Sequence, residues 1–190
     1  MARIALEDTA GIYRLADDLR ASHARLDILV NSAGFTTPIP HADLDALDDD
    51  LFERILVANA RGPYSVIRAM LPLMRASEEG VIVNVSSVAA FTGSGSNIAY
   101  CAAKAALDTM GMSLARVLGP RIRVLSVSPG AVATDFVAGR GRDALETIAA
   151  SSPLKRVIEP EDVADAVMAC ILHLRATTGT RIVVDGGRHL

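Results

Sequence analysis

The chain has 190 residues, which suits one domain with a sizeable hydrophobic core. Its formal net charge is −3, so it lacks the basic surface typical of nucleic-acid-binding proteins. No apolar run is long and charge-free enough for a membrane span, and the early charges do not predict a signal peptide. Two cysteines do not make a disulfide framework or a metal site, so we expect a reduced, cytoplasmic protein without a bound metal.

The first third of the chain predicts alternating strands and helices. Residues 2–6 are compatible with a short strand, and residues 11–23 carry an apolar stripe at helical spacing with charges opposite it. The apolar run at residues 26–31 ends in small residues, which favours a buried parallel strand. Residues 35–48 contain two prolines and several acids, which indicates a loop.

Residues 49–76 predict a long helix, because apolar side chains recur at helical spacing. Asn59, Arg61, Gly62 and Pro63 interrupt this pattern. An asparagine followed closely by glycine and proline predicts a kink with freed backbone groups.

The stretch from residue 81 to residue 104 carries the chemistry. A β-branched run predicts a buried strand, and Ser86 and Ser87 follow it, where an open α/β sheet places its active site. A Gly/Ser-rich loop (88–97) leads to an Ala-rich helix (99–118). Tyr100 and Lys104 are four residues apart on one helical face.

A phenol beside a fixed ammonium is easier to ionise, and a tyrosine that titrates near ~10 needs such help near neutrality. Ser87, Tyr100 and Lys104 therefore make a plausible acid/base set. The alternative is a buried tyrosine and a lysine whose stem covers an ordinary helix.

The rest of the chain continues the alternation. A strand at 121–127 leads into a Pro-Gly turn, and residues 135–153 end in a helical segment. A helix begins near Pro160 and runs to about residue 174, before a last strand within 178–187. The sequence thus predicts one α/β domain over residues 1–190, built on a doubly wound parallel sheet.

Three segments resemble the short-chain dehydrogenase/reductase family. They are the Tyr-x-x-x-Lys pattern at Tyr100 with Ser87 thirteen residues before it, the run Asn31-Ser-Ala-Gly34, and the C-terminal segment 178–187. This resemblance covers nearly the whole chain. It implies a Rossmann-like fold and an oxidoreductase that moves a hydride between NAD or NADP and a carbonyl or secondary alcohol. The 3-oxoacyl-carrier-protein reductase-like members look most similar.

The resemblance also implies four catalytic roles. Tyr100 donates a proton to the substrate carbonyl, and Ser87 hydrogen-bonds the same oxygen. Lys104 lowers the pKa of Tyr100 and holds the nicotinamide ribose, while Asn59 anchors a proton-relay water. Asn59 is also compatible with a structural role in the kink, and the two roles can coexist.

Further residues are implied to bind the cofactor. Asp8 falls where the family contacts the adenine, and the Pro-Gly turn falls where it meets the nicotinamide carboxamide. An ordinary turn is the simpler interpretation of Pro-Gly. The cofactor-binding set comprises Asp8, Asn31, Ala33, Gly34, Tyr100, Lys104, Pro129, Gly130, Val132 and Thr134.

The family's Gly-rich turn, Thr-Gly-x-x-x-Gly-x-Gly, does not precede Asn31. We therefore expect an N-terminally truncated fold that lacks its first βαβ portion, exposes the edge of the strand at 26–31 and grips a dinucleotide weakly. The alternative function is a non-catalytic remnant that acts only in oligomerisation or interaction. We also expect a homo-oligomer, a dimer or tetramer, paired through the helices at 49–76 and 99–118, with no nucleic-acid or membrane partner.

Overall fold

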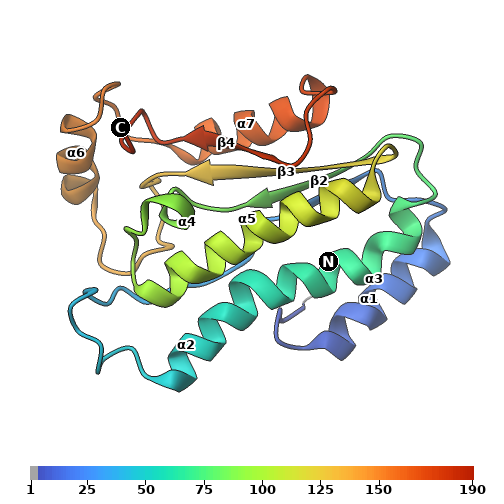
Figure 1. The fold of residues 1–190 in the computed structure, drawn as a ribbon, viewed down its shortest axis with the longest axis horizontal. Coiled ribbons are helices and arrows are strands. Elements are labelled where there is room, and N and C mark those ends of the chain that lie inside the picture. The colour runs from blue at the N-terminus through green and yellow to red at the C-terminus, as the bar shows by residue number, and fades with distance from the viewer. Residues whose placement is uncertain (1–3) are drawn as a thin grey trace.

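Four parallel strands form one sheet, and their spatial order, β1-β2-β3-β4, is also their order along the chain. The computed structural model describes residues 4–190 and shows the sheet flanked by helices (Figure 1). Parallel neighbours need crossover connections, and here each crossover carries at least one helix. The strands are β1 (Ile28–Asn31), β2 (Gly80–Val85), β3 (Ile122–Pro129) and β4 (Thr180–Val184).

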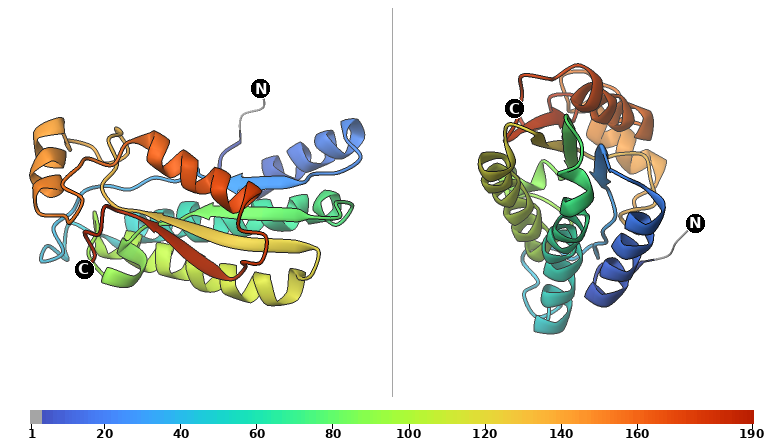
Figure 2. Two further views of the ribbon diagram at one scale, coloured as in Figure 1. Left: turned by 90° about the horizontal axis from the view of Figure 1, so that it is seen from above. Right: turned by 90° about the vertical axis from the view of Figure 1, so that its right-hand side faces the viewer.

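Helices cover both faces of this sheet. The end-on view in Figure 2 shows α1, α3 and α5 on one side and α7 on the other. This confirms the predicted α/β architecture with helices on two faces. The helical elements are α1 (Thr9–Ser22), α2 (Asp49–Leu56), the π-helical turn η1 (Val57–Arg61), α3 (Gly62–Met74), α4 (Ala89–Thr92), α5 (Ile98–Leu118), α6 (Arg142–Ala150) and α7 (Pro160–Leu172).

The central strands β2 and β3 are apolar because both of their faces are covered. Ile82 and Val124 pack against α3 and α5, whereas Val83 and Val127 pack on the opposite side with Cys170 of α7. All five side chains are fully buried. This central pair therefore fixes the strand ends at which the candidate site lies.

The edge strand β1 is covered less completely. It pairs only with β2 among the strands of residues 4–190. Ile28 and Val30 are 44% and 41% exposed, whereas the alternating Leu29 packs against α1 and α3. The described part of the chain thus leaves an apolar strip along this edge.

The predicted helix at 49–76 is divided into α2, η1 and α3. In the π-helical turn the N–H of Gly62 bonds to the carbonyl of Val57, five residues earlier. Pro63 follows and has no N–H to continue the regular ladder. The predicted interruption is confirmed, and single π turns of this kind are frequent at functional sites.

The predicted strand at 2–6 is wrong for residues 4–6, and residues 1–3 lie outside the described part. The chain turns there instead, with the N–H of Asp8 donating to the carbonyl of Ala5 at 3.1 Å. Asp8 then caps α1, as its carboxylate accepts the N–H of Gly11 at 2.9 Å. Because this turn and the helix cap follow one another directly, the residues before α1 do not extend beside another strand.

The loop predicted at 88–97 contains one helical turn, α4, which ends at Gly93 with a positive φ of 66°. Its four residues are too few for helical periodicity to be recognised in the sequence.

Both cysteines are buried and unbonded to each other. Within residues 4–190, no helix combines the length and the apolar character that crossing a membrane requires.

Candidate active site

Ser87 lies just beyond the carboxyl end of β2. The N–H groups of Ser86 and Val88 still bond to β3, at Val127 and Pro129 with distances of 2.7 and 3.0 Å. Between them the Ser87 hydroxyl accepts the N–H of Ala89 at 3.2 Å, where α4 begins. The strand end and the helical turn together fix the backbone of Ser87.

Tyr100 is positioned by the cap of α5. The side-chain oxygen of Asn97 accepts the N–H of Tyr100 at 2.7 Å, so the helix begins at a defined residue. The amide of Asn97 donates to the carbonyl of Thr37 at 2.7 Å, which ties the cap to the loop before α2. Asn97 is fully buried, and asparagine is among the residues preferred at a helix N-cap.

Lys104 lies one turn after Tyr100, on the same face of α5. Its ammonium donates to the carbonyl of Val85 at 2.8 Å and lies 5.6 Å from the centre of the Tyr100 ring. An ammonium has three donors, so two N–H groups are available for other partners. The lysine is only 5% exposed.

Burial shifts the pKa values of both residues. The pKa of Tyr100 rises to about 12, chiefly because the phenol is desolvated, and the Ser87 hydroxyl only partly opposes this rise. The pKa of Lys104 falls to about 8 for the same reason, although the carboxylate of Asp108 opposes the fall. The sequence predicted a lowered pKa for Tyr100, and this direction is wrong for the structure, because desolvation of the buried phenol raises the pKa.

Ser87, Tyr100 and Lys104 line one cavity of about 450 Å³. The Pro-Gly turn after β3 forms another part of its wall, and Pro129, Gly130, Val132 and Thr134 all line it. A Cβ on Gly130 would lie 2.8 Å from Cβ of Asp185, so the close approach of this turn to β4 requires glycine. Seven of the predicted site residues thus meet in one space.

Five predicted residues lie outside the cavity lining: Asp8, Asn31, Ala33, Gly34 and Asn59. Asp8 caps α1 and pairs with Arg14 at 3.3 Å, and its predicted contact with an adenine remains a prediction. Asn31 donates to the side chain of Asn84 on the neighbouring strand at 2.9 Å. Ser32, the residue between Asn31 and Ala33, does line the cavity.

Asn59 is fully buried in the π-helical turn. Its amide nitrogen donates to the carbonyls of Phe35 and Ile55, at 2.8 and 3.0 Å. Its side-chain oxygen has no hydrogen-bond partner among the described residues. Such an oxygen is a ready acceptor for a water molecule, and the two donated bonds also give Asn59 a structural role.

Several lining residues were not predicted. Phe136 packs near the Tyr100 ring with centroids 5.9 Å apart, and Arg140 and Arg188 enter from the segment before α6 and from the C-terminal tail. Arg140 lies in the segment 135–153, for which only a helical end was predicted, and Arg188 directly follows the C-terminal segment 178–187. Nothing in their spacing reveals that they meet.

Comparison with known proteins finds similar sequences and a similar fold. The family model described as Enoyl-(Acyl carrier protein) reductase matches residues 3–189. Ketoacyl reductase 2 of the granaticin polyketide synthase from Streptomyces violaceoruber is 37% identical over 190 residues, covering 99% of this chain and 76% of that protein. A crystal structure of a short-chain dehydrogenase/reductase from Burkholderia xenovorans is 38% identical with a TM-score of 0.88, covering 96% of this chain and 73% of that one.

The chain belongs to the short-chain dehydrogenase/reductase family.

Membership of this family of oxidoreductases confirms the resemblance inferred from the segment around Ser87, Tyr100 and Lys104. The structure of 4-hydroxyisoleucine dehydrogenase complexed with NADH is also similar, at 28% identity and a TM-score of 0.86, covering 98% of this chain and 79% of that one. Short-chain dehydrogenases/reductases with different named substrates therefore share this framework.

Proposed function

We propose that this chain moves a hydride between NAD or NADP and a small carbonyl or secondary alcohol substrate, with Ser87, Tyr100, Lys104 and Asn59 as its catalytic set. The observation that carries the proposal is the convergence of Ser87, Tyr100 and Lys104 on one cavity. The similarity to an NADH complex supports a nicotinamide cofactor, and the comparisons do not favour a non-catalytic role.

The residues present fit the nicotinamide end of such a cofactor. The two available N–H groups of Lys104 suit a pair of ribose hydroxyls. The wall formed by Pro129, Gly130, Val132 and Thr134 would hold the carboxamide, as the resemblance to the family implies. When bound, the nicotinamide would supply or accept the hydride.

Tyr100 acts as the proton donor in the reductive direction. With a pKa of about 12 the phenol is protonated at neutral pH, so it has a proton to give to the carbonyl oxygen. The Ser87 hydroxyl donates a hydrogen bond to the same oxygen as negative charge develops there. The ammonium of Lys104 stabilises the phenolate that remains, because opposite charges attract strongly in a desolvated site.

Asn59 completes the proton path. Its unpartnered side-chain oxygen would hold a water molecule, from which the Tyr100–Lys104 pair regains a proton.

The proposal also includes a homo-oligomer in which α2–α3 and α5 pair with a second copy.

The test is oxidation of NADH and NADPH, followed by absorbance, with a panel of a 3-oxoacyl thioester, a 3-ketosteroid and cyclic ketones. We expect turnover with at least one of them and a loss of several hundredfold or more in Tyr100→Phe, as removal of a general acid costs roughly 10²–10⁴-fold. Tyr64→Phe is the matched control, because that phenol is exposed on α3, away from the cavity lining. No turnover with any substrate, or full turnover in Tyr100→Phe, would reject the proposal.

A further inference from the structure

Two arginines that line the active-site cavity have no acidic partner. Arg140 and Arg188 make no ion pair and no side-chain hydrogen bond with any residue in the range 4–190. Four other arginines in the same third of the chain are each paired with a carboxylate: Arg142, Arg156, Arg175 and Arg181. Arg142 and Arg156 find their carboxylates close in sequence, whereas Arg175 and Arg181 pair with the distant Glu79 and Asp108.

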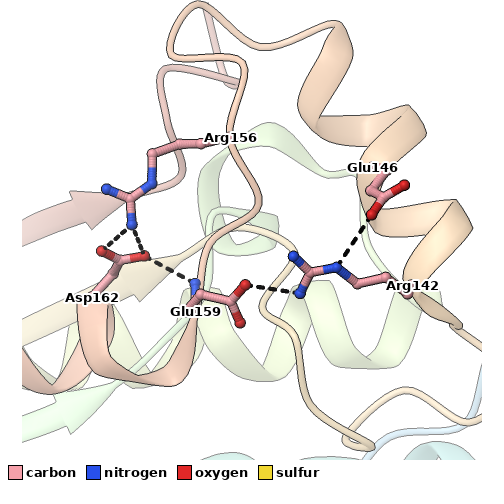
Figure 3. A network of polar contacts seen from close by, with 5 residues as sticks. All are labelled: Arg142, Glu146, Arg156, Glu159 and Asp162. Atoms are coloured by element: carbon pink, nitrogen blue, oxygen red, sulfur yellow. Dashed lines mark hydrogen bonds and ion pairs between the residues drawn. The ribbon is translucent and has the colours of Figure 1, made fainter.

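Figure 3 shows how the first of these neighbours is held. Arg142, at the start of α6, donates to Glu159 at 2.8 Å and to Glu146 at 3.4 Å. Glu159 caps α7 together with Asp162, which also pairs with Arg156. The network ties the start of α6, two residues after Arg140, to the start of α7.

The backbone around Arg188 is also fixed. The carboxylate of Asp185 accepts the N–H groups of Gly187 and His189, each at 2.9 Å. The His189 ring packs edge-on against Phe91 of α4, with centroids 5.6 Å apart. Arg188 lies between Gly187 and His189, so hydrogen bonds hold the backbone on both sides of it.

The cavity is cationic although the chain is acidic. Among the described residues 4–190, its charged lining residues are Lys104, Arg140 and Arg188, with no aspartate or glutamate, while the whole chain carries −3. The pKa of Arg140 is lowered by burial and then by the charge of Arg188, while Tyr100 acts in the opposite sense, so the two guanidinium groups repel one another. Like charges held together in this way are relieved by an anion between them.

We infer that Arg140 and Arg188 bind a negatively charged group of the substrate, a carboxylate or a phosphate, within the cavity that Tyr100 and Lys104 also line. This inference rests on the proposed function and names the class of substrate: an anionic ketone or secondary alcohol. Planar guanidinium groups match carboxylate and phosphate oxygens in pairs, which makes arginine well suited to this task.

The pyrophosphate of the cofactor offers the same chemistry from another source. The position of the arginines favours the substrate. The charge of Arg140 acts on the Tyr100 phenol, and Arg188 precedes His189, which packs on Phe91 of α4. This helical turn begins two residues after Ser87. Both arginines thus lie beside the groups that act on the carbonyl.

The experiment is calorimetric titration of the 190-residue chain with two matched pairs of ketones. The pairs are 4-oxocyclohexanecarboxylate with its methyl ester, and dihydroxyacetone phosphate with dihydroxyacetone. We expect at least one charged ketone to bind more tightly than its neutral partner. Arg140→Gln and Arg188→Gln should each weaken that charged ketone roughly tenfold or more, as expected for a lost charged hydrogen bond, and leave the neutral ketone unchanged.

Arg175→Gln is the matched control, since it removes an exposed arginine whose carboxylate partner, Glu79, is remote from the cavity lining. Arg140→Lys and Arg188→Lys keep the charge and should retain part of the preference, which separates lost charge from lost folding. Equal binding of both members of each pair would overturn the inference. Unchanged charged-ketone binding in both glutamine variants would do the same.

Titration with NADH and NADPH separates the two sources of anion. If the glutamine variants weaken the dinucleotides but not the charged ketones, the arginines serve the cofactor and the inference is wrong. Tyr100→Phe should keep the preference for the charged ketone in binding. Failure of the proposed function would therefore appear as unchanged turnover in Tyr100→Phe, independently of the arginine result.

Discussion

The side-chain oxygen of Asn59 lies 2.5 Å from the point that a Cβ on Gly34 would occupy. Asn59 cannot easily retreat, because it is fully buried and its amide nitrogen is held by two carbonyls. The side chain of Asn59, a candidate catalytic residue in η1, therefore requires glycine at position 34. This packing adds to the cofactor contact that the sequence implies for Gly34.

Gly34→Ala should displace Asn59 and lower both stability and turnover. We expect a loss of about 1–3 kcal/mol in the free energy of unfolding, as is usual for overpacking a well-packed site. Urea denaturation and turnover measure the two effects. Gly111→Ala is the control, because a Cβ there meets its nearest neighbours at an ordinary 3.7 Å and glycine in a helix interior costs about 1 kcal/mol relative to alanine. Equal stability of the two variants would contradict the argument.

The buried ammonium of Lys104 predicts that stability rises with pH. Its pKa is about 8 in the folded chain against an ordinary value of 10.5. Between these values the unfolded chain holds a proton that the folded chain has lost, so the free energy of unfolding increases with pH, by about 3 kcal/mol over the whole window. Tyr100 acts in the opposite sense only above pH 10, since its pKa is raised from 10.0 to about 12.

Lys104→Met should abolish this rise, and denaturation midpoints from pH 8 to pH 9.5 measure it. Lys155→Met replaces the other lysine, which is exposed, and should keep the rise. The same slope in Lys104→Met and in the unmodified chain would show that Lys104 does not titrate in this range.

Asp108→Asn should make the reductase activity fall at a lower pH. Asp108 follows Lys104 by one helical turn, is 6% exposed, and its charge raises the pKa of Lys104 against the effect of burial. Without that charge, Lys104 loses its proton at a lower pH and therefore stabilises the Tyr100 phenolate over a narrower pH range. The pH profile of turnover measures the shift. Arg181 lies 3.8 Å from Asp108 and provides the control. Arg181→Gln keeps the carboxylate of Asp108, so its turnover should fall at a higher pH than the turnover of Asp108→Asn.

Met112→Glu should weaken the predicted homo-oligomer. Met112 on α5 and Tyr64 on α3 are 42% and 41% exposed, as apolar residues at a subunit interface would be in an isolated chain. A buried charge in such an interface is costly, so light scattering at micromolar concentration should show a smaller mass. Leu44→Glu changes an exposed residue outside both helices and should not. A monomeric mass for the unmodified chain would contradict the prediction.

The sequence predicted what depends on local spacing. Tyr100 and Lys104 share a face because one helix fixes them four residues apart, and Ser87 follows a strand whose apolar run is unmistakable. Arg140 and Arg188 could not be predicted, because only the tertiary fold brings their segments to one cavity. The direction of the Tyr100 pKa was missed for a similar reason, since it depends on burial by distant residues.

The identity of spatial and chain order in the sheet has a consequence for biosynthesis. Each strand pairs with the strand made just before it, so no strand has to wait for a partner that the ribosome has yet to release. At roughly 5–20 residues per second, the sheet can grow in one direction as the chain emerges. Ser87 and Tyr100 are placed once β3 has joined β2, whereas Arg188 arrives only behind β4. The nascent chain therefore acquires its reactive groups before the arginine pair that we assign to substrate selection is complete.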